Sequence, residues 1–430
     1  MNELELFLSK INAICKDHAE LSIESSREII NEINSFLYTT YPGIGEVSAL
    51  NTKYDYFSDF HKYWEKHHKE ILNIQVNRSN CERVADILHD VFLKTNGKVF
   101  SDLYDTNGLR EDEICRVRFL TANQDFRGSR DFSDLSKIYK NDPDIFTADY
   151  IVENPEDFLK KIKITDLSQT DKRIKYAKTI GHFLIERQLS SPYDLLAYYR
   201  NDVFALRQDM INCMGAGYGN KKTDMFIRDM IILGVWKNVI GFDKIDVASD
   251  INTIKVALRT GIMTCEIPLL SSFLDIFCYQ YGYVAEMNAK AWRTVWEIWN
   301  QKYEEKIESP SLLDFFIYRI VGREFCKVNL YTYQCEKGHT FLWNTQAKSV
   351  CPECKGKVTV IDRRYMCDAQ DGSVVTERLL PQYKNCPFKD ICDKNDKKKL
   401  QPPKSISILG QTGWTSAYTE TECGGGGLMA

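Results

Sequence analysis

The sequence lacks several features that would each point to a class of protein. Its 56 basic and 60 acidic residues give a net charge of −4, so the chain as a whole has no field that would mark a nucleic-acid binder. Any site for a polyanion must therefore be a local patch. No stretch approaches the ~18 uninterrupted apolar residues of a membrane-spanning helix. The first residues have neither the basic start nor the apolar run of a signal peptide, so we expect a cytoplasmic protein without a membrane partner.

Cysteine is sparse over most of the chain and concentrated near one end. The 14 cysteines among 430 residues are too few for a disulfide scaffold, yet eight of them lie beyond residue 325. In a reducing compartment, clustered cysteines bind metal more often than they form disulfides. The cysteine distribution therefore predicts a metal-binding module in the last quarter of the chain.

The spacing of apolar residues predicts helices through the first three quarters of the chain. Apolar side chains recur three and four residues apart in residues 84–92 and 174–185, which is typical of one face of a helix. From Gly322 onward, short strands, turns and cysteines replace this pattern. We therefore expect a mainly α protein with a helical N-terminal region over 1–113, a helical core over 114–320, a cysteine-rich module over 321–400 and a flexible tail over 401–430.

A glycine-rich turn in the core is the most informative motif. Gly215, Gly217 and Gly219 precede the pair Lys221 and Lys222. Glycines let the backbone turn tightly between two helices, and the N–H groups at the start of the second helix favour an anion such as a phosphate. Many ordinary helix–helix turns have the same composition. Taken alone, the motif therefore predicts either a phosphate contact or a plain turn.

A second motif follows at Asp250, which stands just before a new amphipathic helix. Together the two motifs resemble the helix-hairpin-helix superfamily of DNA glycosylases, in which a G-x-G-x-K-T hairpin and a helix precede an aspartate that begins the next helix. The Lys222-Thr223 pair with Phe226 and Met230 is most similar to the archaeal 8-oxoguanine glycosylase branch. Colinear similarity covers roughly residues 114–265 and includes residues 119–125, 144–149, 155–159 and 172–185.

The resemblance implies a two-lobed helix-hairpin-helix core, with a small C-terminal cysteine-rich metal-binding module added to it. It implies a DNA glycosylase that extrudes and excises a base from double-stranded DNA. Asp250 would stabilise the oxocarbenium-like sugar and activate the nucleophile. Lys222, which matches the K-T pair, or Lys221, which matches the G-x-G-x-K spacing, would add a lyase step through a Schiff base; we favour Lys222. Further residues would read the extruded base (Gln124 and Asn123) and contact DNA (Gly215, Gly217 and Gly219).

The same residues also allow plainer interpretations. Asp250 fits a helix N-cap, the lysines fit simple phosphate contacts, and Asn123 and Gln124 fit amides on a helix surface. The chain also departs from the family, because Ala248-Ser249 replaces the usual proline before the aspartate and Tyr218 replaces a small aliphatic residue. Two other functions stay open: an N-glycosidase acting on a modified nucleoside or RNA, and a non-catalytic DNA-binding adaptor. The excised base would be 8-oxoguanine, another lesion, or a modified base of phage DNA in antiviral defence.

The cysteine-rich region holds two groups of candidate ligands. A pair of turns, each with two ligands, is similar to a zinc ribbon: Cys335 with His339, and Cys351 with Cys354. Cys326 is an alternative ligand for the first turn. The second group is Cys367, Cys386 and Cys392, of which the last two resemble the end of the iron–sulfur loop of some glycosylases in the superfamily. These cysteines predict a second zinc or an iron–sulfur cluster, with Cys326 or Cys423 as the fourth ligand, or else buried free thiols.

Overall fold

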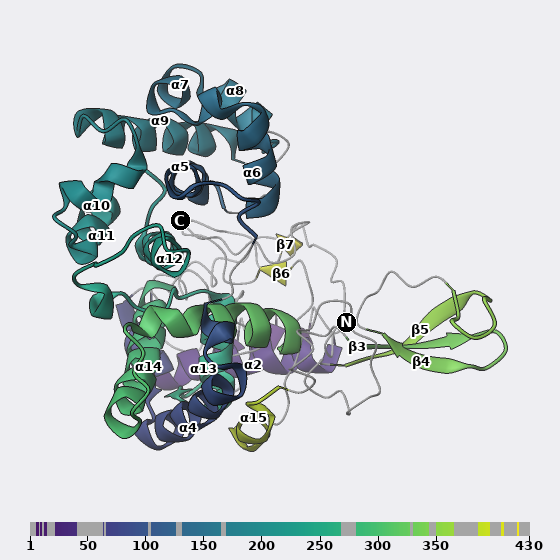
Figure 1. Cartoon of the computed structure of the whole chain (residues 1–430). Helices are drawn as coiled ribbons and strands as arrows, with labels where there is room; N and C mark the ends of the chain where they lie inside the picture. Colours follow the sequence, from purple (N-terminus) through teal and green to yellow (C-terminus); the bar gives the residue numbers. More distant parts are fainter. Residues whose placement is uncertain are drawn as a thin grey trace. The chain divides into compact units, whose positions relative to one another are not determined.

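The structure is a computed structural model that describes most of the chain (Figure 1). The described residues are 6–7, 9–10, 13–14, 22–40, 63, 66–101, 105–125, 131–164, 169–267, 281–326, 330–343, 350–364, 386–395, 406–407 and 419–420. Most of them are helical, which confirms the predicted mainly α class. Among these described helices, none combines the length and the apolar character needed to cross a membrane.

The chain forms two compact units, each built from separate segments of sequence. The first unit consists of Met1–Val91, Ser249–Ile298 and Phe316–Ala430, and the second unit consists of Phe92–Ala248 and Trp299–Phe315. Asp250 and the cysteine-rich region therefore belong to the first unit. The glycine-rich turn with both candidate lysines belongs to the second unit.

In the described part of the second unit the regular elements are helices, apart from one isolated β-bridge between Asp202 and Ile240. Its α-helices are α5 (Glu111–Ala122), α6 (Phe132–Asn141), α7 (Ala148–Glu153), α8 (Pro155–Lys161), α9 (Thr170–Glu186), α10 (Leu195–Tyr198), α11 (Val203–Asn212) and α12 (Asn220–Ile232). Short 3-10 helices lie at Lys98–Phe100, Pro143–Phe146, Pro192–Asp194, Phe242–Lys244 and Pro310–Leu313. The predicted helix over 174–185 is confirmed as part of α9, whose apolar face buries Ala177, Ile180, Phe183 and Leu184.

Local sequence explains where these helices begin and end. The helix α6 ends at Asn141, and Pro143 begins the next turn, because a proline cannot continue the hydrogen-bond ladder. The Asp202 side chain caps α11 by accepting hydrogen bonds from the amides of Phe204 and Ala205. The helix α12 begins at Asn220, directly after the glycine-rich turn.

The first unit combines helices with short strands. Its elements include α2 (Ile23–Thr40), α4 (Arg78–Thr95), α13 (Ile251–Thr260), α14 (Tyr281–Lys302), a π-helix (Phe316–Phe325) and α15 (Lys389–Asn395); α4 and α14 continue past the unit boundaries. Strands β1 (Gln75–Val76) and β2 (Met263–Thr264) pair with each other, as do β6 (Ile406–Ser407) and β7 (Thr419–Glu420). Strands β3 (Leu330–Cys335), β4 (Thr340–Trp343) and β5 (Val358–Arg364) form an antiparallel sheet in the order β4-β3-β5.

Buried ion pairs fix α12 within the second unit. Asp229, which has no exposed surface, accepts from Arg118 Nε of α5 at 2.8 Å and from Arg228 at 2.6 Å. Arg228 also pairs with Asp314, and Asp224 pairs with Arg207 of α11. Removing one partner of a buried pair typically costs about 3–5 kcal/mol, because the other charge is left without compensation. These contacts therefore hold α12 at both its first half (Asp224) and its second half (Arg228 and Asp229).

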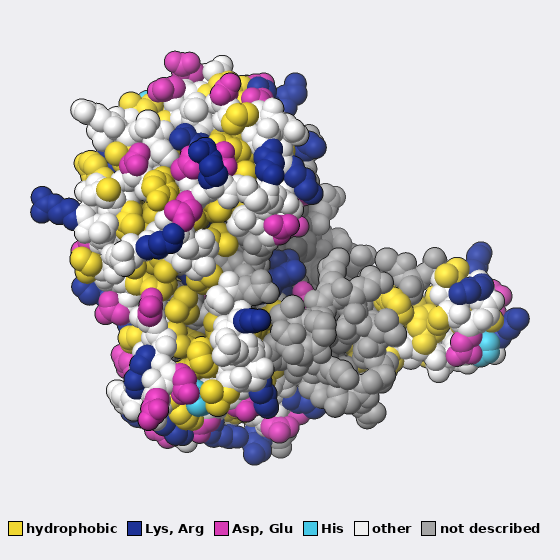
Figure 2. Space-filling model, viewed as in Figure 1, with side chains coloured by type: hydrophobic (Ala, Val, Ile, Leu, Met, Phe, Trp, Pro, Cys, Tyr) yellow, Lys and Arg dark blue, Asp and Glu magenta, His cyan; other side chains and the backbone are white. Residues whose placement is uncertain are grey.

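Charges of both signs are mixed on the surface. In the space-filling view, Lys and Arg side chains alternate with Asp and Glu over the visible face of the described residues (Figure 2). This distribution agrees with the net charge of −4. A site for a polyanion must therefore depend on a local group of basic residues.

Candidate functional site

The turn between α11 and α12 needs glycine at two positions. Gly215 has φ +91° and Gly217 has φ +75°, values that favour glycine. A Cβ at Gly217 would lie 2.4 Å from Cδ2 of Tyr176, and a Cβ at Gly215 would lie 2.9 Å from Cε of Lys175. The backbone of the turn therefore packs directly against side chains of α9.

Gly219 has a different role. It is the N-cap of α12 and has extended backbone, and no side chain caps the helix there. The first N–H groups of a helix lack partners within the helix, and together with the helix dipole they favour an anion. The start of α12 therefore has the local chemistry of a phosphate contact.

Tyr218 anchors the turn in the core. Its side chain is buried, its hydroxyl donates to the Phe119 carbonyl oxygen at 2.6 Å, and its ring stacks on Phe119 with centroids 5.8 Å apart. The larger residue at this position thus adds a hydrogen-bonded aromatic contact between the turn and α5.

The contrast between two glycines gives a stability prediction. Gly217→Ser should lower the free energy of unfolding by about 2 kcal/mol or more, because serine is strained at positive φ and meets the Tyr176 ring. Gly219→Ser should be neutral or stabilising, because the site is open and serine is a favourable N-cap. Urea denaturation of both variants measures the difference. Equal losses would contradict the positions assigned to the two glycines.

The two candidate lysines have different surroundings. Lys222 is partly buried, and its Nζ donates to the Asn123 main-chain carbonyl at 2.8 Å. The same Nζ lies 5.9 Å from the centroid of the Tyr176 ring. For Lys221, which is also partly exposed, the described residues offer no hydrogen bond or ion pair. The structure thus distinguishes two neighbouring lysines that the motif alone leaves ambiguous.

Burial lowers the pKa of Lys222 to about 7. The carboxylate of Asp125 opposes this shift, and neighbouring positive charges increase it: Lys221, Arg173 and Lys172. Lys172 also lies over the Tyr176 ring, with its Nζ 5.7 Å from the centroid. A lysine with this pKa is largely neutral slightly above pH 7, and a neutral amine is a nucleophile.

Asn123 and Gln124 are both buried and lie beside this lysine. The Asn123 amide nitrogen donates to the main-chain oxygens of Tyr176 at 3.1 Å and Ala216 at 3.0 Å. The Gln124 amide nitrogen donates to the Arg173 carbonyl at 3.1 Å. Among the described residues, neither side-chain oxygen has a hydrogen-bond partner. Their predicted contact with an extruded base stays a prediction.

Asp250 begins α13 in the first unit and acts as its N-cap. Its Oδ1 accepts from the amides of Asn252 and Thr253, each at 2.9 Å, and its Oδ2 accepts from the Asn252 side chain at 3.0 Å. The helix-cap interpretation of Asp250 is therefore confirmed. The catalytic role of this carboxylate stays a prediction.

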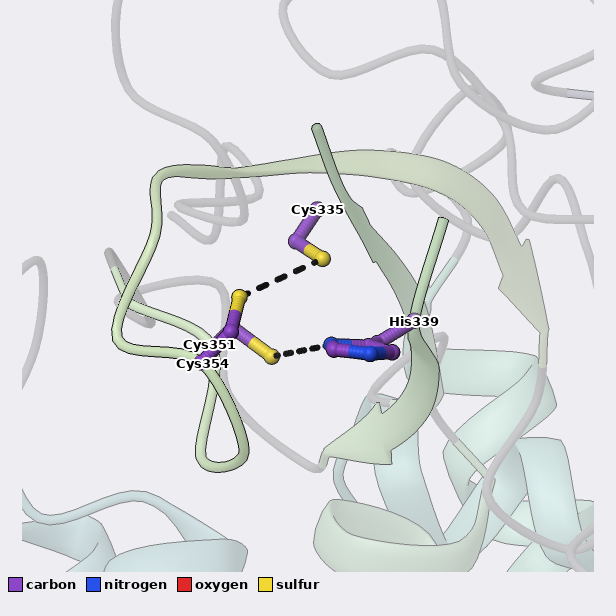
Figure 3. Close-up of side chains that lie close together, drawn as sticks. All are labelled: Cys335, His339, Cys351 and Cys354. Carbon is purple, nitrogen blue, oxygen red and sulfur yellow. Dashed lines mark hydrogen bonds between the residues drawn. The ribbon is translucent and has the colours of Figure 1, made fainter. Parts of the chain in front are cut away.

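Four side chains in the first unit form a candidate metal site. The ligand atoms of Cys335, His339, Cys351 and Cys354 all lie within 4.8 Å of one another (Figure 3). The sulfurs of Cys335 and Cys354 are 3.7 Å apart, and Cys351 Sγ lies 3.7 Å from His339 Nδ1. A tetrahedral zinc with Zn–S bonds of about 2.3 Å requires sulfurs about 3.8 Å apart. The predicted group can therefore hold a metal ion such as zinc.

Tight turns present these ligands in pairs. The Cys335 amide donates to the His339 carbonyl at 3.0 Å, and the Cys351 amide donates to the Gly356 carbonyl at 2.8 Å. The backbone amide of Cys354 lowers the pKa of the Cys351 thiol to about 7, which favours the thiolate that binds metal. Glu353 lies 3.6 Å from His339 Nε2, so a carboxylate can orient the ring while Nδ1 faces the metal position.

The other predicted ligands are only partly described. Cys326, Cys386 and Cys392 are buried, and Cys367 lies outside the described residues. Within the described ranges, the group at Cys335 is the only set of three or more possible ligands. This set includes His339 and does not include Cys326, the alternative that the sequence left open. The second metal site stays a prediction.

Comparisons with protein-family models, curated proteins and solved structures found no match for this chain. The structure adds several residues to the candidate sites: Asp125, Lys172, Arg173, Tyr176 and Glu353. All five lie within stretches that the sequence analysis singled out, but none of them was predicted there as a site residue. The i, i+4 spacing of Lys172 and Tyr176 on α9 is the one signal that places two of them on the same face.

Proposed function

We propose that the protein is a DNA N-glycosylase that excises a damaged or modified base and that uses Lys222 as its nucleophile. The observation that carries this proposal is a partly buried amine directly after a glycine-rich turn, whose Nζ donates to the Asn123 main-chain carbonyl at 2.8 Å; its burial lowers its pKa to about 7. Most surface lysines that contact phosphate stay charged, because a charged group binds the backbone best. A lysine whose surroundings favour the neutral form is suited to covalent chemistry.

The proposed reaction joins the Lys222 nitrogen to C1′ of the sugar. The neutral amine attacks C1′, the bond to the base breaks with its electron pair, and the departing base takes up a proton. Loss of one proton from nitrogen lets its electron pair open the sugar ring, whose ring oxygen takes up a proton, and gives the protonated Schiff base. Loss of a proton from C2′ then expels the 3′ phosphate by β-elimination. Asp250 would stabilise the cationic sugar, since a carboxylate favours developing positive charge.

The basic group around the turn supports DNA as the polymer. Lys172, Lys175 and Lys221 lie near the open start of α12, where phosphates would find both backbone N–H groups and positive charge. In the first unit, we infer that the three thiolates and one imidazole bind zinc and that the sheet β4-β3-β5 is a docking module for nucleic acid. Three sulfurs and one nitrogen are a common ligand set of structural zinc.

The catalytic role proposed for Asp250 can be separated from its role as a helix cap. Asp250→Asn should reduce base release by ~100-fold or more, because the negative charge is lost. The free energy of unfolding should change by less than ~1 kcal/mol, since asparagine is an equally good N-cap. Single-turnover base release and urea denaturation give the two numbers. Unchanged base release would show that the carboxylate serves only as a cap.

The proposed activity is tested by a screen of DNA duplexes with different damaged or modified bases, scored for abasic sites. Release from at least one duplex, absent with Lys222→Gln, supports the proposal. Tight duplex binding without release from any substrate would instead favour a DNA-binding adaptor. Release from nucleosides or RNA alone would favour the other N-glycosidase activity.

A further inference from the structure

We propose that Asn123 is a positioning residue for Lys222: its amide ties α9 to the glycine-rich turn while its main-chain carbonyl holds the lysine amine. The inference rests on the proposed use of Lys222 as a nucleophile. It assigns Asn123 a task that does not require contact with a base.

Three contacts meet at Asn123. The amide nitrogen uses both of its protons, one for the Tyr176 carbonyl of α9 and one for the Ala216 carbonyl in the turn. The main-chain carbonyl accepts from Lys222 Nζ of α12 at 2.8 Å. Since the side chain has no exposed surface, no water competes for these bonds. One residue at the end of α5 thus connects three other segments of the chain.

The contact with Tyr176 also fixes the ring beside the lysine. The Tyr176 ring packs against Gly217 and lies below the amines of Lys222 and Lys172, at 5.9 Å and 5.7 Å. Without the Asn123 amide, the carbonyls of Tyr176 and Ala216 would lose their donor and the segments would separate. Water would then reach the lysine amine, and the burial that keeps it neutral would be lost.

The charged groups that face Lys222 come from three places. Asp125 follows α5 and favours the charged amine, whereas Lys172 and Arg173 of α9 and Lys221 of α12 disfavour it. Separation of α9 from the turn would weaken the repulsion from Lys172 and Arg173 and leave the attraction from Asp125. Both changes act in the same direction, toward a charged and unreactive Lys222 at neutral pH.

The test measures the reactivity of Lys222 without any DNA. Acetic anhydride labels neutral amines, and peptide mass spectrometry gives the labelled fraction at Lys222 as a function of pH. In the wild-type protein the midpoint should lie near pH 7. In Asn123→Ala it should rise by at least one pH unit, so that labelling at pH 7 falls about fivefold or more.

Asn300→Ala is the control, because it removes a partly buried amide of the same unit that donates to the Ile307 carbonyl at 2.8 Å, and Asn300 is not among the groups that act on Lys222. It should keep the wild-type midpoint. Asn123→Ser can keep only one of the two donated bonds, so it should shift the midpoint in the same direction by a smaller amount and gives a second test if the alanine variant does not fold. An unchanged midpoint in folded Asn123→Ala, or in Asn123→Ser where the alanine variant does not fold, or an equal shift in Asn300→Ala, would overturn the proposal.

The outcome is independent of the glycosylase assignment. A shift specific to Asn123 supports the positioning role even if no duplex loses a base. Base release by the wild-type protein with no shift in the Asn123 variants would keep the proposed function and reject the positioning role.

Discussion

Lys222→Gln should abolish the covalent complex that borohydride traps between the protein and its substrate DNA, with a loss of about a thousandfold or more. Glutamine keeps the length and polarity of the side chain but has no nucleophilic amine. Gel electrophoresis of reactions quenched with borohydride measures the complex directly. The matched control is Lys221→Gln, which removes the neighbouring lysine and should retain trapping. If trapping is lost only with Lys221→Gln, the nucleophile is Lys221 and not Lys222.

The pH dependence of the same reaction should follow the Lys222 amine. The rate should rise as pH increases through about 7, the value to which burial lowers this pKa. At pH 5, two units lower, about one amine in a hundred is neutral, so trapping should fall to about that fraction of its plateau. A profile that rises only above pH 9 would indicate an ordinary, solvated lysine.

The lowered pKa also links Lys222 to stability. The folded protein binds the Lys222 proton less tightly than the unfolded chain, whose lysine titrates near its ordinary value of 10.5. Between about 7 and 10.5 unfolding takes up this proton, so Lys222 makes the free energy of unfolding rise with pH by up to ~1.4 kcal/mol per unit. Below about pH 7 the amine is charged in both states, and the full cost of burying this charge lowers the free energy of unfolding. Lys222→Met should remove this slope and stabilise the protein most at low pH.

Cys351→Ser should reduce bound zinc by one ion per chain and unfold the sheet β4-β3-β5. Structural zinc contributes about 10–16 kcal/mol to the folding of small zinc domains, whereas a short three-stranded sheet has few apolar contacts of its own. Metal analysis gives the stoichiometry. Hydrogen exchange of the paired strands, for example at Tyr333 and Phe341, reports whether the sheet is lost.

Two cysteines outside the group serve as controls for this effect. Cys81→Ala removes a buried cysteine of α4 and should leave the metal content unchanged. Cys326→Ala should also keep the zinc, since Cys326 is not among the four converging ligands. If Cys326→Ala loses zinc and His339→Ala retains it, the fourth ligand is Cys326 and not His339.

The sequence predicts local structure well because the causes are local. Residues three and four apart determine the buried face of α9, and Pro143 limits the preceding helix. The four-ligand group is predicted equally well, since two short turns with fixed spacing need only one hairpin to bring them together. Here every partner lies within about 20 residues along the chain.

The environment of Lys222 could not be predicted in the same way. Successive residues of a helix point about 100° apart, so Lys221 and Lys222 differ only once the rotation of α12 is known. The groups that lower the pKa of Lys222 by charge include Arg173 and Lys172, which lie on a helix far earlier in the chain. Their proximity depends on packing around Tyr218, Tyr176 and Asn123, and no periodicity encodes it.

The ribosome adds the two residues of the Arg228–Asp314 ion pair to the growing chain at well-separated times. The two residues are separated by 86 positions, and the segment between them includes part of the first unit. At about 5–20 residues per second, a ribosome needs roughly 4–17 s to add Asp314 after Arg228. During that time Arg228 has only Asp229 as its carboxylate partner. The nascent second unit therefore completes this buried ion pair only after about three quarters of the chain has been made.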